Sequence, residues 1–70
     1  MKLSARNQLP ATVRSVTEGQ VMAEVVVTVD GGHEVVGAIT AESARRLGLA
    51  KGKRVTVVIK STEVMLATDD

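Results

Sequence analysis

The sequence predicts a mainly β fold, a small five-stranded Greek-key barrel of the OB type with one short helix between its third and fourth strands. Three observations support this prediction. Apolar and polar residues alternate along five stretches of the 70-residue chain, which is the pattern of strands with one buried face. Glycines suited to tight turns separate most of these stretches, and one segment carries the start and stop signals of a helix. The order strand, strand, strand, helix, strand, strand is that of an OB barrel.

The first strand is expected over residues 9–18. Residues at alternate positions are expected to share a face, with Leu9, Ala11, Val13 and Ser15 on one side and Thr12, Arg14, Val16 and Glu18 on the other. Pro10 has no N–H to donate to a ladder, so it should lie at the start of the strand or at an edge of the sheet.

The second and third strands are expected over residues 20–29 and 33–40. The second is the most strand-like stretch, and one face of it is apolar throughout: Val21, Ala23, Val25, Val27 and Val29. Asp30-Gly31-Gly32 predicts a tight turn between them, because glycine readily adopts the positive φ angles that such turns need. These two strands should therefore pair antiparallel.

A helix of about two turns is expected over residues 41–47. Thr40 precedes it as a candidate N-cap, whose hydroxyl can accept a hydrogen bond from an N–H of the first turn. Gly48 follows as a candidate C′ residue. A helix this short is held by packing rather than by its own propensity, and we expect Ala44 and Leu47 to provide that packing.

The last two strands are expected over residues 53–60 and 62–66, where the alternation resumes on either side of Ser61. The acidic end, Thr68-Asp69-Asp70, should fray.

Length and composition predict a single domain, residues 1–70, that depends on assembly. A chain this short buries only about 60% of the surface that its unfolded state exposes. Small domains compensate with disulfides, a structural metal or oligomerisation. The chain has no cysteine and only one histidine, His33, so the first two routes are closed or nearly so. Aromatic residues are absent, and valine occupies both faces of some strands, which favours a second packing surface.

The charge balance and the distribution of apolar residues argue against two classes of partner. The formal net charge is only +1, so no field of the whole molecule attracts nucleic acid or an anionic membrane. No apolar run is long enough to span a bilayer, and Met1-Lys2-Leu3 leads directly into polar residues rather than into a signal segment. We therefore expect a soluble cytoplasmic protein with no membrane partner.

Three polar clusters contain hydrogen-bond donors without an acid-base pair: Ser4-Ala5-Arg6-Asn7-Gln8, Thr40-Ala41-Glu42-Ser43 and Lys60-Ser61-Thr62. An oxyanion without protons, such as a tetrahedral metal oxide dianion, accepts hydrogen bonds and donates none. It is best held by N–H groups, hydroxyls and one or two cations. Such a site discriminates against hydrogen phosphate, whose proton would find no acceptor, at a cost of about 1–3 kcal/mol. The clusters therefore predict a site for a proton-free oxyanion, formed within one chain or between chains.

Four motifs in register give the chain a specific resemblance to a known family. They are Ser4-Ala5-Arg6-Asn7-Gln8-Leu9, Val21-Met22-Ala23-Glu24-Val25, Ile39-Thr40-Ala41-Glu42-Ser43 and Ile59-Lys60-Ser61-Thr62-Glu63-Val64-Met65. In these motifs the chain resembles the molbindins, the Mop family of molybdate- and tungstate-binding proteins. Many relatives have glycine soon after the first motif, whereas this chain has Pro10-Ala11.

The resemblance implies an OB-like barrel that assembles as a hexamer, a trimer of dimers, and binds molybdate or tungstate at subunit interfaces without an organic cofactor. One subunit would contribute the residues of the first and last clusters, Ser4, Ala5, Arg6, Lys60 and Ser61. Thr40 and Ser43 would come from its neighbour. The family also has a second kind of site, for which Gly19, Gln20, Val21 and Met22 are the candidate residues. The implied role is intracellular storage or homeostasis of molybdenum, with the metal bound as an oxyanion.

Other interpretations of the same residues remain open. Arg6 and Lys60 could be ordinary solvated charges at strand ends. Thr40 and Ser43 could serve only to cap the N-terminus of the helix. The chain could be a ligand-free module for oligomerisation. It could also bind nucleic acid, as many OB barrels do, although such surfaces stack bases on aromatic rings that this chain lacks. An enzyme is not predicted, because no nucleophile and base pair, phosphate-binding glycine loop or metal-ligand spacing is present.

Overall fold

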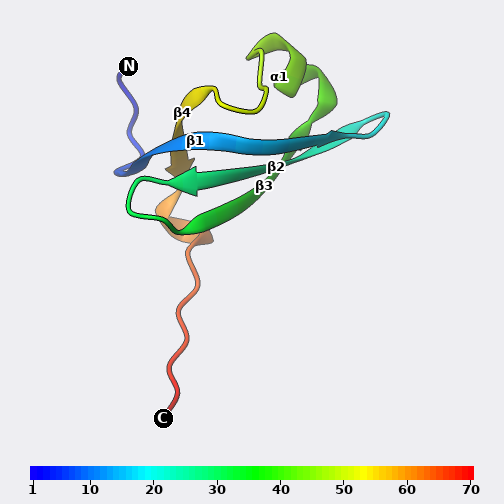
Figure 1. Ribbon diagram of the computed structural model, residues 1–70. Helices are drawn as coiled ribbons and strands as arrows, with labels where there is room; N and C mark the ends of the chain where they lie inside the picture. The colour runs from blue at the N-terminus through cyan, green and yellow to red at the C-terminus, as the bar shows by residue number, and fades with distance from the viewer.

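The computed structural model describes residues 1–70 and contains one antiparallel sheet of four strands in the order β3-β2-β1-β4. Its elements are β1 (Asn7–Glu18), β2 (Met22–Val29), β3 (Glu34–Thr40), the helix α1 (Ala41–Arg46), β4 (Arg54–Ile59) and a turn of 3-10 helix, η1 (Ser61–Glu63). The sheet curves into half a barrel, and the C-terminal residues extend away from it (Figure 1). The predicted small, mainly β, OB-like fold with one short helix after the third strand is confirmed.

The fifth strand predicted over residues 62–66 is wrong. Directly after β4 the chain turns through η1, which leads the following residues away from both edges of the sheet (Figure 1). Val64 has the extended angles φ −82° and ψ 130°, but no neighbouring strand lies beside it. Met65 and Leu66 are each 92% exposed. Alternation therefore predicted extended backbone wrongly at Thr62 and Glu63, which lie in η1, and correctly at Val64. A ladder also needs a partner edge, which a local pattern does not specify.

β1 is central, and it pairs with β4 through residues 7–12 and with β2 from Ala11 onward. Pro10 lies one position before the ladder with β2 begins, so its missing N–H interrupts no bond of that ladder. Its carbonyl oxygen accepts a hydrogen bond of 3.0 Å from the N–H of Asp30. Pro10 nevertheless pairs with Thr56 inside the ladder between β1 and β4, so the prediction that it lies at the start of the strand or at an edge of the sheet is wrong.

A β-bulge in β1 reverses the predicted alternation. The register with β2 shifts between Val13 and Ser15. Ala11 and Val13 are buried, but Ser15, predicted on the same face, is exposed, and Val16, predicted on the opposite face, packs against the core. The predicted division into two faces is wrong beyond Val13, because the extra residue changes which side chain points inward.

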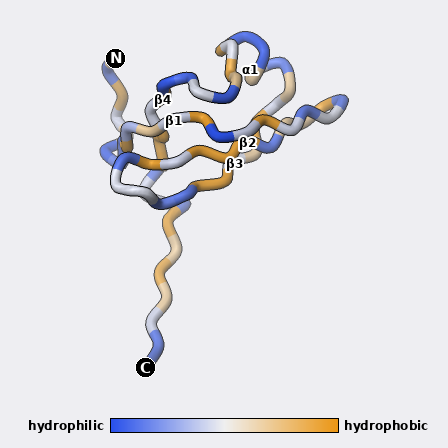
Figure 2. Tube along the Cα trace, in the orientation of Figure 1, coloured by the Kyte–Doolittle hydropathy of each residue, from blue (hydrophilic) through white to orange (hydrophobic).

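The hydrophobic core is small and consists of Ala11, Val13, Val25 and Val27 from the two central strands. Partly buried residues surround it: Val16, Val29, Val35, Ile39, Leu49, Val55 and Val57. Figure 2 shows apolar residues along these strands and again along the extended C-terminal segment. Only 7 of 70 residues are buried, which is consistent with the predicted dependence on assembly.

The hairpin between β2 and β3 forms as predicted, in antiparallel register from Met22↔Thr40 to Thr28↔Glu34. Gly31 and Gly32 have φ angles of 105° and 106°, which side chains with a Cβ rarely adopt. The Asp-Gly-Gly sequence therefore fixes this connection through its backbone.

The helix α1 is capped as predicted but packs differently. The hydroxyl of Thr40 accepts from the N–H of Ser43 at 3.0 Å, and Gly48 has a φ of 64°. Ala41 and Ala44 are buried, whereas Leu47 is 53% exposed, so the prediction that Leu47 anchors the helix is wrong. With six residues, α1 lacks the length and the apolar character needed to cross a membrane.

Arg54 links the start of β4 to the β2–β3 hairpin. Its guanidinium donates to both carboxylate oxygens of Asp30, at 2.8 and 2.9 Å, and to the hydroxyl of Thr12 at 2.8 Å. The hydrogen bond from Arg54, supported by its charge, lowers the pKa of Asp30 below its ordinary value. Both side chains remain more than half exposed, so solvent screens this pair.

We expect this pair to make stability depend on acid pH. Because the pKa of Asp30 is lower in the folded state, its contribution is complete above the ordinary aspartate pKa and is lost as the pH falls below about 4. Asp30→Asn should remove part of that acid dependence. Thermal unfolding between about pH 6 and pH 2 measures it, and identical pH profiles for the two proteins would contradict the expectation.

Candidate oxyanion-binding site

A polar pocket lies where β1 begins and β4 ends. It has a volume of about 700 Å³ and is lined by Ser4, Ala5, Arg6, Asn7, Val58, Lys60 and Ser61. Five of these are the residues that the sequence assigns to one subunit of the site. The first and last polar clusters of the chain are therefore brought together, although more than 50 positions separate them.

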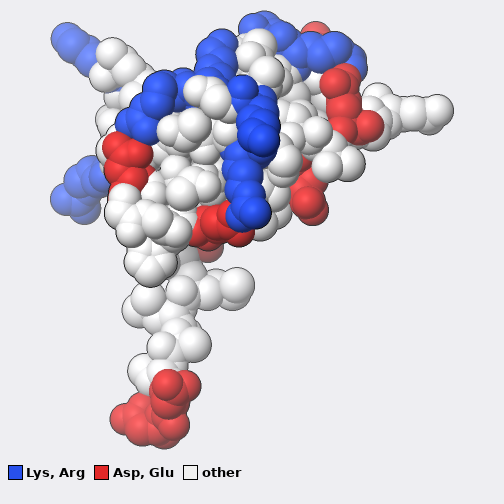
Figure 3. All heavy atoms as spheres, in the orientation of Figure 1, with Lys and Arg blue, Asp and Glu red and all other residues white.

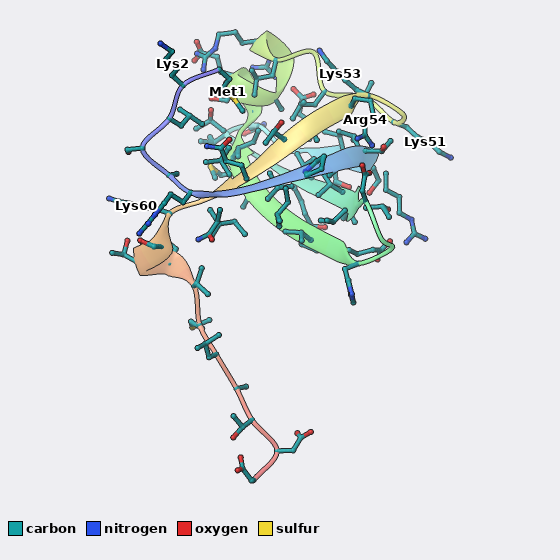
Figure 4. All side chains as sticks on the ribbon, turned by 90° about the vertical axis from the view of Figure 1, so that its left-hand side faces the viewer. Met1, Lys2, Lys51, Lys53, Arg54 and Lys60 are labelled. Carbon is teal, nitrogen blue, oxygen red and sulfur yellow. The ribbon has the colours of Figure 1, made fainter.

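The register between β1 and β4 explains this convergence. Asn7 pairs with Ile59 and Gln8 with Val58 in an antiparallel ladder. Residues that precede β1 and residues that follow β4 must therefore leave the sheet at the same end. Figure 4 shows Lys60 beside the N-terminal segment, at the opposite end of β4 from Lys51, Lys53 and Arg54.

Two side-chain amides hold the segments of the pocket in place. The Nδ2 of Asn7 donates to the carbonyl oxygen of Ile59 at 3.0 Å, which joins the start of β1 to the end of β4. The Nε2 of Gln8 donates to the carbonyl oxygen of Ala5 at 2.7 Å, which closes the loop before β1. Sequence reasoning counted both amides as donors but did not assign Asn7 to the site. The sequence signal that could have assigned Asn7 to the site was its position in the first motif, between Arg6 and Gln8.

The pocket has an excess of positive charge that the chain does not neutralise. Arg6 and Lys60 both line it, no Asp or Glu does, and neither cation forms an ion pair. The hydroxyls of Ser4 and Ser61 complete the set of side-chain donors. Such a lining fits an anion that accepts hydrogen bonds and donates none.

Around α1 and the start of β4 lie five basic residues, Arg45, Arg46, Lys51, Lys53 and Arg54, of which three are engaged within the chain. Arg45 pairs with Glu18, Arg54 with Asp30, and the Nζ of Lys53 donates to the carbonyl oxygen of Leu47 at 2.5 Å. Figure 3 shows basic and acidic side chains interspersed over this face. Carboxylates neutralise Arg45 and Arg54, which reduces the attraction of this surface for a polyanion.

Thr40 and Ser43 lie at the other end of the sheet. Thr40 pairs with Met22, beside the far end of β1, and neither Thr40 nor Ser43 lines the pocket. The hydroxyl of Thr40 donates to the Oγ of Ser43 at 2.7 Å and accepts from the N–H of Ser43. The hydroxyl proton of Ser43 is therefore left to donate elsewhere.

The candidate second site, Gly19 to Met22, is the turn between β1 and β2. The N–H of Gly19 donates to the carbonyl oxygen of Met22 at 2.8 Å, and the N–H of Ala41 donates to that of Val21 at 2.7 Å. Gln20, Val21 and Met22 are exposed, and none of the four residues lines a pocket. This turn is thus adjacent to Thr40 and remote from the polar pocket.

Comparison with known proteins gives consistent matches along the chain. The protein-family model described as the TOBE domain matches residues 3–66. Molybdenum-pterin-binding protein 3 of Clostridium pasteurianum is 47% identical over 66 residues, which are 94% of this chain and 97% of that protein.

Solved structures agree with the sequence matches. A molybdate-binding protein from Sporomusa ovata has a TM-score of 0.90 and 43% identity, covering 97% of this chain and 100% of its own. The cytoplasmic molybdate-binding protein ModG, with molybdate bound, has a TM-score of 0.83 and 41% identity, covering 94% of this chain and 53% of its own. A cooperative binding mechanism has been suggested for ModG. Because the family model and these relatives span nearly all of it, the chain belongs to the TOBE-domain family, within the group of molbindin (Mop) proteins.

Proposed function

We propose that this protein binds molybdate, or tungstate, as a tetrahedral oxyanion and acts as a binding protein rather than an enzyme. The observation that carries the proposal is the pocket at the ends of β1 and β4, which contains two unpaired cations, two hydroxyls and no carboxylate. The names of its relatives, which include molybdate-binding proteins, support it. Residues 1–70 would act as a single domain in this role.

The complete site would lie between subunits. Ser4, Ala5, Arg6, Lys60 and Ser61 would bind the oxyanion from one subunit, and Thr40 and Ser43 would bind it from a neighbour. The separation of these two groups within the chain supports this division, since the pocket contains neither Thr40 nor Ser43. The free hydroxyl proton of Ser43 is a donor of the kind that such an anion needs.

Assembly as a hexamer, a trimer of dimers, would provide these interfaces. The amount of exposed apolar surface supports assembly of some kind. Val21 is 72% exposed, Val36 62%, and Met65 and Leu66 92% each. Contiguous exposed apolar surface commonly marks an interface between proteins. The cooperative mechanism suggested for ModG also requires sites that communicate.

The bound species would be the oxyanion alone, without a pterin, although several relatives are named as molybdenum-pterin-binding proteins. The composition supports this choice, because the chain contains no Phe, Trp or Tyr on which a pterin ring could stack. The turn from Gly19 to Met22 remains the proposed second site. We place the protein in the cytoplasm, as ModG is, with a role in storing or buffering molybdenum.

Native mass spectrometry with and without micromolar molybdate tests the function. The expected result is a hexamer that gains whole molybdate or tungstate ions and no organic mass. Elemental analysis after dialysis should then find retained molybdenum. A chain that assembles but retains neither metal would instead be a structural module, and the proposed function would be wrong.

A further inference from the structure

A site that selects proton-free oxyanions must present donors and conceal acceptors. Every segment of backbone that lines a pocket brings carbonyl oxygens with it, and each is an acceptor. A free carbonyl near the anion would repel a dianion and would give the proton of hydrogen phosphate a partner. The carbonyl groups of the two segments that form the pocket therefore matter as much as its cations.

Three carbonyl oxygens of these segments are occupied by donors from the same chain. That of Ala5 accepts from the Nε2 of Gln8 at 2.7 Å, and that of Ile59 accepts from the Nδ2 of Asn7 at 3.0 Å. That of Lys60 accepts from the N–H of Glu63 at 2.9 Å, within η1. Ala5 and Lys60 line the pocket directly, and Ile59 lies between the lining residues Val58 and Lys60.

Two of these three donors are side chains, which the local backbone does not require. β1 and β4 already pair through their backbones at Asn7 and Gln8. The amides of Asn7 and Gln8 add donors directed at carbonyl groups rather than at solvent. Asn7 is itself half-buried in the lining of the pocket, so its side chain is ordered in this role.

We propose that Asn7 and Gln8 are positioning residues that determine which oxyanions the pocket accepts. By occupying the carbonyl oxygens of Ile59 and Ala5, their amides remove two acceptors from the segments that form the pocket. The pocket then favours proton-free anions over anions that carry a proton. This proposal rests on the proposed function of the pocket.

Sulfate and phosphate provide the test, because they are tetrahedral anions of similar size that differ in protonation near neutral pH. Each is used to compete with molybdate for the complete assembled protein, followed by calorimetry. In the unaltered protein, sulfate should compete better than phosphate. Gln8→Met and Asn7→Leu keep the approximate size of the side chains and remove their donors. Each should narrow the preference for sulfate over phosphate by about 2- to 10-fold, the equivalent of one ordinary hydrogen bond gained or lost.

The pH dependence separates selectivity from a loss of fold. The gain in phosphate binding by Gln8→Met should be larger at about pH 6 than at about pH 8, since phosphate carries more protons at the lower pH. Gln8 is exposed, so its variant should fold even if Asn7→Leu does not. Thr17→Val, an exposed substitution at the far end of β1, is the matched control and should keep the original preference.

Two results would overturn the proposal in different ways. Weaker molybdate binding with an unchanged sulfate-to-phosphate ratio in Gln8→Met would mean that the amide only supports the loop, although the proposed function would stand. An unaltered protein that binds neither molybdate nor tungstate would overturn the proposed function itself.

Discussion

Replacing Arg6 or Lys60 by alanine should weaken molybdate binding by about 1.5–3 kcal/mol in each case, which corresponds to roughly 10- to 150-fold in Kd. Each of these cations lines the pocket and has no acidic partner in the chain, so its charge is available to the anion. The hydrogen bond that is lost is one to a charged group, which is the stronger class. Isothermal calorimetry on the assembled protein measures the change.

Two matched controls distinguish a ligand from a general electrostatic effect. Arg46→Ala and Lys51→Ala remove the same charges from exposed positions that do not line the pocket. Neither should change the affinity by more than a small factor that salt removes. Unchanged affinity in both Arg6→Ala and Lys60→Ala would show that the site has been assigned to the wrong residues.

Removal of residues 64–70 should dissociate the assembly while leaving the half-barrel folded. Met65 and Leu66 are each 92% exposed and Val64 is 47% exposed, so loss of the segment should cost the isolated fold little. If a neighbouring subunit buries them, each contributes about 1.5–3 kcal/mol to association. Light scattering coupled to size-exclusion chromatography reports the subunit number, and circular dichroism reports the strands.

A shorter deletion is the control for this effect. Removing residues 67–70 takes away the acidic end and retains the three apolar side chains. This variant should assemble as the complete chain does. An intact oligomer after deletion of residues 64–70 would show that the exposed apolar segment does not form the interface.

Much of the fold could be predicted because it depends on local signals. The Asp30-Gly31-Gly32 turn and the Thr40 cap each act through backbone geometry within a few residues, and both are present. The bulge at Arg14 could not be predicted from alternation, because it depends on how β1 fits its partner strand. The exposure of Leu47 and the absence of a fifth strand could not be predicted for the same reason. Each depends on whether a packing partner distant in the sequence is present, which a local pattern does not show.

The site was predictable to the extent that its residue types indicate its chemistry. A cluster of donors without carboxylates indicates an acceptor ligand, and the ladder between β1 and β4 brings Arg6 and Lys60 to one pocket. The acceptors that must be concealed were not predictable, because backbone carbonyl groups have no signature in a sequence. The hydrogen bonds of Asn7 and Gln8 become visible only when the strands are placed.

If the proposed site and the proposed assembly both form, the three residues of η1 would let the protein release its ion on dilution. η1 begins at the pocket residue Ser61 and ends at Glu63, directly before the apolar segment that starts at Val64. An ion bound at one end of η1 and a subunit contact at the other end would both restrict the conformation of the same three-residue turn. Thermodynamic linkage makes such coupling reciprocal, so the factor by which the ion strengthens association equals the factor by which association strengthens ion binding. The fraction of molybdate that is bound would then depend on the concentration of the protein as well as on that of free molybdate.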